Sequence, residues 1–184
     1  MDKTTLDIDD GFDALDKSYL ARCIKALKEM GAPLSGWECV DTIDVREDDP
    51  EAPLSECEVC GCDRVRYEHY MEHRHFPFQV MTGCICAGII EGSILDAKER
   101  ERKVKNRSAR RRRFAEKEWK ETIPGVYRRR YRHHEVTLYE HGGTFTVDVN
   151  GRRETRYKGR PITDLLSAGY AAFDMIDKRE DLHA

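Results

Sequence analysis

Five of the seven cysteines lie within residues 57–86, at spacings that suit a bound metal ion. Cys57 and Cys60 belong to a Cys-x-x-Cys-Gly turn, which directs two sulfurs at one ion while Gly61 lets backbone amides approach the thiolates. A second pair, with Cys-x-Cys spacing, follows at residues 84 and 86. Because structural zinc sites are tetrahedral and commonly use four cysteines, we predict one structural Zn2+ ion. Its predicted ligands are Cys57, Cys60, Cys84 and Cys86.

The identity of the fourth ligand stays open, because the second cysteine pair of most treble-clef zinc units has Cys-x-x-Cys rather than Cys-x-Cys spacing. Either Cys84 lies at the end of a strand, or His69, His73 or Cys62 replaces it. A reduced core without metal is the weaker interpretation, since Gly, Glu and Asp rather than apolar residues flank these cysteines. An odd number of cysteines without an export signal indicates a reducing compartment, where clustered cysteines bind metal more often than they form disulfides.

An enzymatic alternative comes from the hairpin expected between the two cysteine pairs. Glu68-His69 and Glu72-His73 superficially resemble the Asp-His of zinc-bearing HNH (His-Me finger) nucleases, whose fold is also a treble clef. The Asn-containing motif that follows the second cysteine pair in those enzymes is absent here. We therefore predict no catalytic residue, and nuclease activity is the least favoured of three functions.

The charged residues are segregated along the chain. Residues 1–60 carry 16 acidic and 6 basic residues, a net charge of −10, whereas residues 98–132 carry 5 acidic and 16 basic residues, a net charge of +11. A basic block of this kind is typical of a surface that faces phosphates. We expect its side chains to bury little and to bind DNA or RNA. The predicted contacts are Arg100, Lys103, Arg107, Arg110, Arg111, Arg112, Arg113, Arg128, Arg129 and Arg130.

Two other interpretations of the same block remain open. Tyr127 and Tyr131 alternate with its arginines, where they could stack on unpaired bases or simply pack on a sheet face. The block could also be a solvated helix paired with the acidic N-terminal part. In that case the protein would be a regulator that binds a host protein, such as an inhibitor of a nucleic-acid enzyme.

The elements that position these residues follow from hydrophobic periodicity and turn signals. Apolar residues spaced by three and four predict helices over 12–30, 87–91 and 93–121, and a closing helix that begins at Pro161. Alternating residues predict an extended segment at 37–45 and strands at 65–70, 76–81, 126–132, 135–140, 144–149 and 152–157. Asn150-Gly151 is the strongest hairpin turn in the chain.

These elements predict an α+β protein with four segments. They are an acidic N-terminal helix and linker (1–55), a treble-clef-like zinc unit (56–95), a long basic helix (96–122) and an antiparallel meander sheet covered by one helix (123–184). Of the 184 residues, 36% are charged and 39% hydrophobic, so one or two small domains are expected. No apolar run of 18 residues and no signal peptide is present, which predicts a cytoplasmic protein without a membrane partner.

Two resemblances extend these predictions. The run from Gly36-Trp37 through the cysteine motifs and the basic helix to Trp119 resembles a group of small bacterial and bacteriophage proteins, mostly uncharacterised. That resemblance implies a zinc-bound protein of a phage or mobile element and supplies no catalytic residue. The C-terminal strands and helix are loosely similar in topology to the three-stranded DNA-binding domains of the AP2 and integrase N-terminal type.

Overall fold

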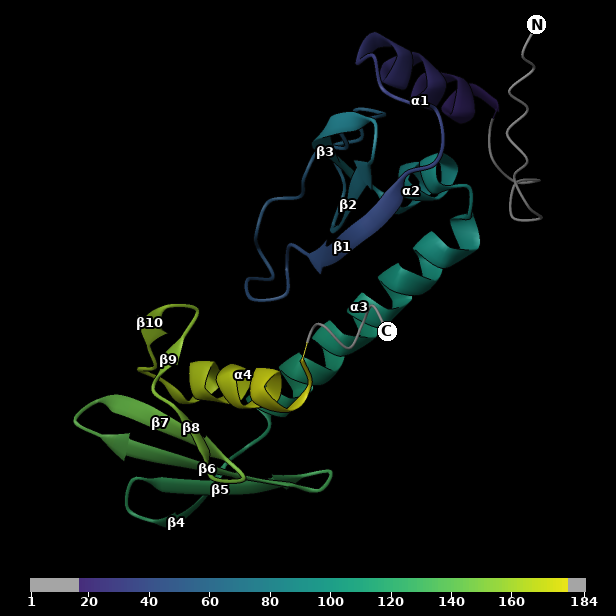
Figure 1. Cartoon of the computed structure of the whole chain (residues 1–184). Coiled ribbons are helices and arrows are strands. Elements are labelled where there is room, and N and C mark those ends of the chain that lie inside the picture. Colours follow the sequence, from purple (N-terminus) through teal and green to yellow (C-terminus); the bar gives the residue numbers. More distant parts are fainter. Residues whose placement is uncertain (1–16, 179–184) are drawn as a thin grey trace, which may run out of the picture. The chain divides into compact units, whose positions relative to one another are not determined.

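The computed structural model describes residues 17–178 and confirms the α+β class, with four helices and three antiparallel sheets among those residues. The chain divides into two compact units, 1–105 and 106–184, so the four expected segments form two bodies (Figure 1). The boundary falls inside helix α3 (Ile94–Glu116). None of the helices within residues 17–178 is both long enough and apolar enough to cross a membrane.

The first unit contains a three-stranded sheet in the order β1-β2-β3 and two helices besides the start of α3. Helix α1 spans Lys17–Glu29, and the predicted beginning of this helix at Phe12 lies outside the described residues. Strand β1 (Glu38–Asp44) pairs with β2 (Tyr67–His73), which forms the expected hairpin with β3 (Phe76–Thr82). Helix α2 (Cys84–Glu91) follows β3, so the expected order of knuckle, hairpin and helix is present.

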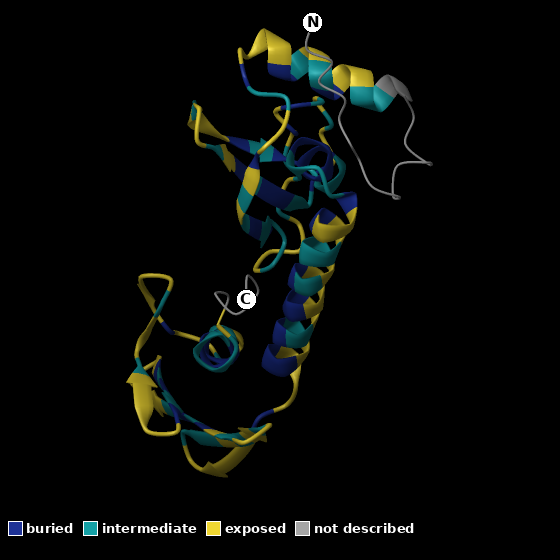
Figure 2. Ribbon diagram, turned by 45° about the vertical axis from the view of Figure 1, so that its right-hand side comes forward, coloured by how far each residue is buried: buried dark blue, intermediate teal, exposed yellow. Residues whose placement is uncertain are grey.

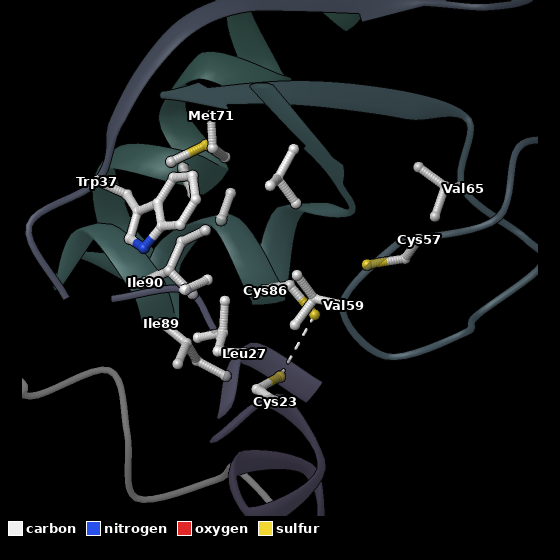
Figure 3. Packing of buried hydrophobic residues seen from close by; sticks show 14 residues of the cluster. Cys23, Leu27, Trp37, Cys57, Val59, Val65, Met71, Cys86, Ile89 and Ile90 are labelled. Carbon is white, nitrogen blue, oxygen red and sulfur yellow. Dashed lines mark hydrogen bonds between the residues drawn. The ribbon is translucent and has the colours of Figure 1, made fainter. Parts of the chain in front are cut away.

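The core of the first unit lies between its helices and its sheet. Figure 3 shows Leu27 of α1 close to Ile89 and Ile90 of α2, with Trp37 and Met71 packed above them. All five side chains are buried. Because each element buries one apolar side in this core, the packing fixes the first turn of α2 relative to the cysteine turn at residues 57–60.

The second unit is a five-stranded antiparallel meander in the order β4-β5-β6-β7-β8. Its strands are β4 (Lys120–Ile123), β5 (Val126–Tyr131), β6 (His134–His141), β7 (Thr144–Val149) and β8 (Arg152–Glu154). Asn150 and Gly151 both have positive φ, at 53° and 88°, as the predicted β7–β8 hairpin turn requires. Two short strands, β9 (Arg156–Tyr157) and β10 (Arg160–Pro161), pair with each other.

Helix α4 (Leu165–Ile176) covers one face of this sheet (Figure 2). Less buried residues alternate with the core residues of β5 to β7 and point to the opposite face. The helix begins later than predicted because Pro161 lies in β10. Asp164 is its N-cap, with its carboxylate accepting a hydrogen bond from the Ser167 amide. Gly169 lets α4 approach α3 closely, since a Cβ there would lie 2.8 Å from the Ala115 Cα.

Helix α3 ends at Glu116, five residues earlier than predicted, and residues 120–123 form strand β4 instead. Tertiary contacts of the residues that follow Glu116 cause this early end of the helix. Strand β4 pairs with β5, and Trp119 is buried in the core of the second unit, with its ring edge-on to Phe114. Trp119 therefore turns the chain into the sheet before Pro124 could end the helix.

Candidate functional site

Three of the four predicted zinc ligands form one group. The sulfurs of Cys57, Cys60 and Cys86 all lie within 4.8 Å of one another. The Cys57–Cys60 turn is closed by hydrogen bonds from the Gly61 amide to the Cys57 carbonyl and from the Cys57 amide to the Cys62 carbonyl, both 2.8 Å long. Gly61 has a φ of +68°, which explains why glycine follows the second cysteine of the turn.

Cys86 reaches this group from the first turn of α2. The N-cap of that helix is Gly83, so the cysteine lies close to backbone N–H groups that have no partner within the helix. The partial positive charge of a helix N-terminus favours a thiolate over a thiol. Three sulfurs, two from a glycine-closed turn and one from a helix N-terminus, make a donor set that suits a soft divalent metal.

A fourth sulfur adjoins the group and comes from α1. Cys23 is completely buried, as the apolar helix face predicts, but its Sγ atom also lies 3.4 Å from the Cys86 Sγ atom. Figure 3 shows the sulfurs of Cys23 and Cys57 pointing toward Cys86 from different sides. Tyr19, one helical turn before Cys23, places its hydroxyl 3.2 Å from Cys60 Sγ and 3.3 Å from Cys86 Sγ.

The electrostatics of these residues favour a cation among the sulfurs. The neighbouring Cys86 thiol and burial raise the pKa of Cys57, and the Cys23 thiol raises the pKa of Cys86. Both shifts arise because adjacent thiolates would repel each other in a buried place. Burial and the two neighbouring thiols also raise the pKa of Tyr19, so its hydroxyl keeps its proton and can donate to sulfur. A divalent ion would neutralise the thiolates, which the protein alone cannot do.

The structure does not bring the fourth predicted ligand, Cys84, into this group. Its sulfur lies instead with His69 of β2 and Glu101 of α3, in a second group whose ligand atoms are within 4.8 Å of one another. Neither Cys62 nor His73, the other substitutes considered, belongs to the three-cysteine group. Cys23 is not among the ligands or substitutes predicted from the sequence. A signal was present in the spacing of Tyr19 and Cys23, because residues four apart face the same side of a helix.

Glu68 and His73 of the hairpin make structural contacts. Glu68 is buried and accepts hydrogen bonds from Ser55 and from the Tyr70 hydroxyl, the latter at 2.7 Å. His69 is the next residue of the same strand, so its side chain points to the opposite face of the sheet. His73 packs against the Trp37 ring with centroids 5.6 Å apart. Glu68 and His69 therefore do not share one site.

The arginines of α3 are largely engaged in ion pairs, contrary to the expectation that they bury little. Arg111 is fully buried and Arg107 nearly so, and both pair with Asp174 of α4 at 3.1 and 2.6 Å. Buried guanidinium groups need such partners because desolvation of an isolated charge is costly. Arg110 pairs with Asp177 at 3.0 Å.

The remaining predicted contacts divide into engaged and exposed side chains. Arg100 forms a pair with Glu91 at 2.6 Å, and Arg129 lies over the Trp119 ring at 4.0 Å and donates to the Glu118 carbonyl at 2.6 Å. Tyr127 and Tyr131 pack on the inner sheet face against Phe145 and against Phe114 and Phe173, respectively. Arg113, Arg128 and Arg130 are exposed, while Lys103 and Arg112 are partly exposed.

Arg128, one of the exposed arginines of β5, belongs to a row that crosses the outer face of the sheet. Residues directly opposite in antiparallel strands share a face. The register places five residues in line across β4 to β8: Lys120, Arg128, Thr137, Asp148 and Arg153. Arg130 lies on the same face opposite Glu135. Within the row only Arg153 has an acidic partner, Asp148, at 2.8 Å.

No protein-family model, curated protein or solved structure matches this chain. The function is therefore inferred from two features of the described residues. They are the sulfur group of the first unit and the basic outer face of the second unit's sheet.

Proposed function

We propose that this protein binds nucleic acid through the outer face of the five-stranded sheet and that a structural Zn2+ ion stabilises its first unit. The contrast between two sets of arginines carries the proposal. Arg107, Arg110 and Arg111 of α3 are engaged by Asp174 and Asp177. Arg128 and Arg130 of β5, in contrast, are exposed and have no ion-pair partner among residues 17–178. Free cationic side chains on an uncovered face are the ones available to phosphates.

The charge of the second unit supports a polyanionic partner. Residues 106–184 carry 18 basic and 12 acidic residues, a net charge of +6, whereas residues 1–105 carry 14 basic and 23 acidic residues, a net charge of −9. Basic side chains that neutralise phosphates release condensed counterions, and this release drives association. Thr137, Tyr139 and Thr146 share the outer face and add hydroxyl donors for phosphate oxygens.

The shape of the sheet also suits nucleic acid. Helix α4 covers only the inner face, so the outer face of an antiparallel sheet remains available for docking (Figure 2). Strands can enter a groove of duplex nucleic acid and present alternate side chains to it. Because residues two apart on β5 point outward together, Arg128 and Arg130 would contact phosphates while Arg129 continues to stabilise the end of α3.

Zinc is the ion that suits the sulfur group best. Thiolate ligands and tetrahedral geometry favour Zn2+ over the hard cations that prefer oxygen. Cys57, Cys60 and Cys86 would hold the ion, and Cys23 would supply the fourth sulfur after a small adjustment of its side chain. Bound there, zinc would link α1, the cysteine turn and α2, and so stabilise a unit with a modest apolar core.

The nucleic-acid proposal is tested with the variant Arg128→Ala/Arg130→Ala and the matched control Arg112→Ala/Arg113→Ala on α3. Fluorescence anisotropy with a labelled duplex and a labelled single strand, at two salt concentrations, measures binding. We expect the sheet variant to lose roughly ten- to a hundredfold in affinity and its salt slope to fall by about one unit per lost phosphate contact. We expect the α3 control to bind like the wild type.

Two results would contradict the proposal. A loss of affinity in the α3 variant alone would mean that nucleic acid binds to the helix rather than to the sheet. Absence of binding to both probes by wild-type protein at low salt would favour the alternative of a regulator that binds a protein. Circular dichroism spectra of all variants would establish that the comparison is made between folded proteins.

A further inference from the structure

The second group, His69, Cys84 and Glu101, brings together three different ligand types from three elements of the first unit. Strand β2 supplies the imidazole, the first turn of α2 supplies the thiol, and α3 supplies the carboxylate. Their ligand atoms all lie within 4.8 Å of one another, and His69 Nε2 is 4.0 Å from Glu101 Oε2. None of these side chains belongs to the three-cysteine group.

The imidazole is arranged like that of a metal-bound histidine. His69 is completely buried, and its Nδ1 atom lies 3.3 Å from the Thr42 hydroxyl oxygen. Its Nε2 atom has no hydrogen-bond partner among the described residues. If Nδ1 carries the proton and donates it to Thr42, Nε2 presents a lone pair toward Glu101 and Cys84. A histidine that ligates a metal normally donates its other N–H to such an outer partner.

Helix geometry explains why the two cysteines of α2 serve different groups. Each helical residue turns the side-chain direction by about 100°, so residues two apart point to nearly opposite sides. Cys86 therefore faces the cysteine turn, and Cys84 faces β2 and α3. Both lie in the first turn of the helix.

We propose that His69, Cys84 and Glu101 form a second metal site that binds Zn2+ and has one coordination position open. A nitrogen, a sulfur and an oxygen ligand suit the borderline-soft character of zinc. Three protein ligands leave the fourth position of a tetrahedral ion for water or an exchangeable ligand, as in catalytic rather than structural zinc sites. Cys84 and Glu101 line a surface hollow of about 370 Å³, through which that ligand would enter.

Metal stoichiometry on full-length protein tests this proposal, with Co2+ as a coloured substitute for zinc. We expect two metal ions per wild-type chain by elemental analysis. Glu101→Gln and Cys84→Ser should each leave one ion, whereas Cys60→Ser should remove the other ion and leave this one. Glu99→Gln is the matched control, because Glu99 is a partly exposed residue of the same helix that pairs with Arg102. We expect that variant to keep two ions.

The open position has its own signature. Azide added to the Co2+ protein should shift the visible absorption bands of the wild type and of Cys60→Ser, and should leave those of Glu101→Gln unchanged. One ion per wild-type chain, lost in Cys60→Ser and kept in Glu101→Gln, would overturn the second site and leave the three-cysteine site standing. Two ions in the wild type that both survive Glu101→Gln and Cys84→Ser would also overturn it.

Discussion

Arg111 of α3 and Asp174 of α4 form a buried ion pair in the core of the second unit. The Arg111 Nε atom lies 3.1 and 3.2 Å from the two carboxylate oxygens, and the guanidinium lies over the Tyr170 ring at 4.0 Å. Asp174 also accepts hydrogen bonds from Arg107 and from the Tyr157 hydroxyl, at 2.6 and 2.7 Å. The most basic part of the sequence is therefore partly a structural core.

Arg111→Ala should lower the free energy of unfolding of the second unit by about 2 kcal/mol, because it removes charge-assisted hydrogen bonds to Asp174 and the packing of the guanidinium on the Tyr170 ring. Arg107 and the Tyr157 hydroxyl still hold the carboxylate in this variant. Urea denaturation in a Trp37→Phe background measures this change, since Trp119 then reports on the second unit alone. Arg112→Ala is the control and should change the free energy by less than about 0.5 kcal/mol, as exposed substitutions commonly do. Equal effects of the two substitutions would show that the ion pair stabilises nothing.

Removal of the metal should loosen the first unit and leave the second unaffected. A metal ion that binds only the folded state adds its binding free energy to the stability of that state. A chelator that removes the ion therefore lowers the stability of the unit that holds it. Hydrogen–deuterium exchange of the intact chain, with and without chelator, measures the effect by segment. We expect faster exchange at residues 55–66 and 83–91 and no change at residues 126–149. Equal protection of the first two segments with and without chelator would contradict the zinc proposal.

Cys23→Ser should weaken zinc binding at the three-cysteine group at least tenfold if the Cys23 sulfur completes the tetrahedron. Competition with a chromophoric chelator measures the affinity. Cys39→Ser is the control, because Cys39 is a free cysteine of the same unit that contacts Thr42 and belongs to neither metal group. Similar affinities of the two variants would mean that Cys23 is only a core residue.

Asp164→Ala should destabilise the second unit by about 1 kcal/mol, because the carboxylate accepts the hydrogen bond of the Ser167 amide at the start of α4. Asp164→Asn should cost only a few tenths of a kcal/mol, since an amide oxygen can accept the same bond. Thermal melting followed by far-ultraviolet circular dichroism measures both variants. If Asp164→Asn and Asp164→Ala lower the stability equally, the charge of Asp164 rather than its capping hydrogen bond stabilises the helix.

Local patterns in the sequence predicted most elements because they depend on residues close together in the chain. The alternation of residues 135–140 and 144–149 and the Asn150-Gly151 turn predicted the β6–β7–β8 meander, and the observed positive φ values confirm the turn. The Cys-x-x-Cys-Gly turn likewise contains its own hydrogen bonds and its glycine. Element ends were less predictable: Trp119 leaves the helix because of a core that distant strands provide.

What the sequence by itself determined is the kind of chemistry present: clustered sulfur donors, a basic middle region, and elements with the right periodicity. Which of those residues act together was decided only by tertiary structure. The arginines of α3 meet Asp174 and Asp177 some 65 residues later in the chain, and the two cysteines of α2 diverge because a helix turns about 100° per residue. Charge and ligand types are local properties of a sequence, whereas distances between side chains depend on how the elements pack. For that reason the same arginine run contains both core residues and free surface charges.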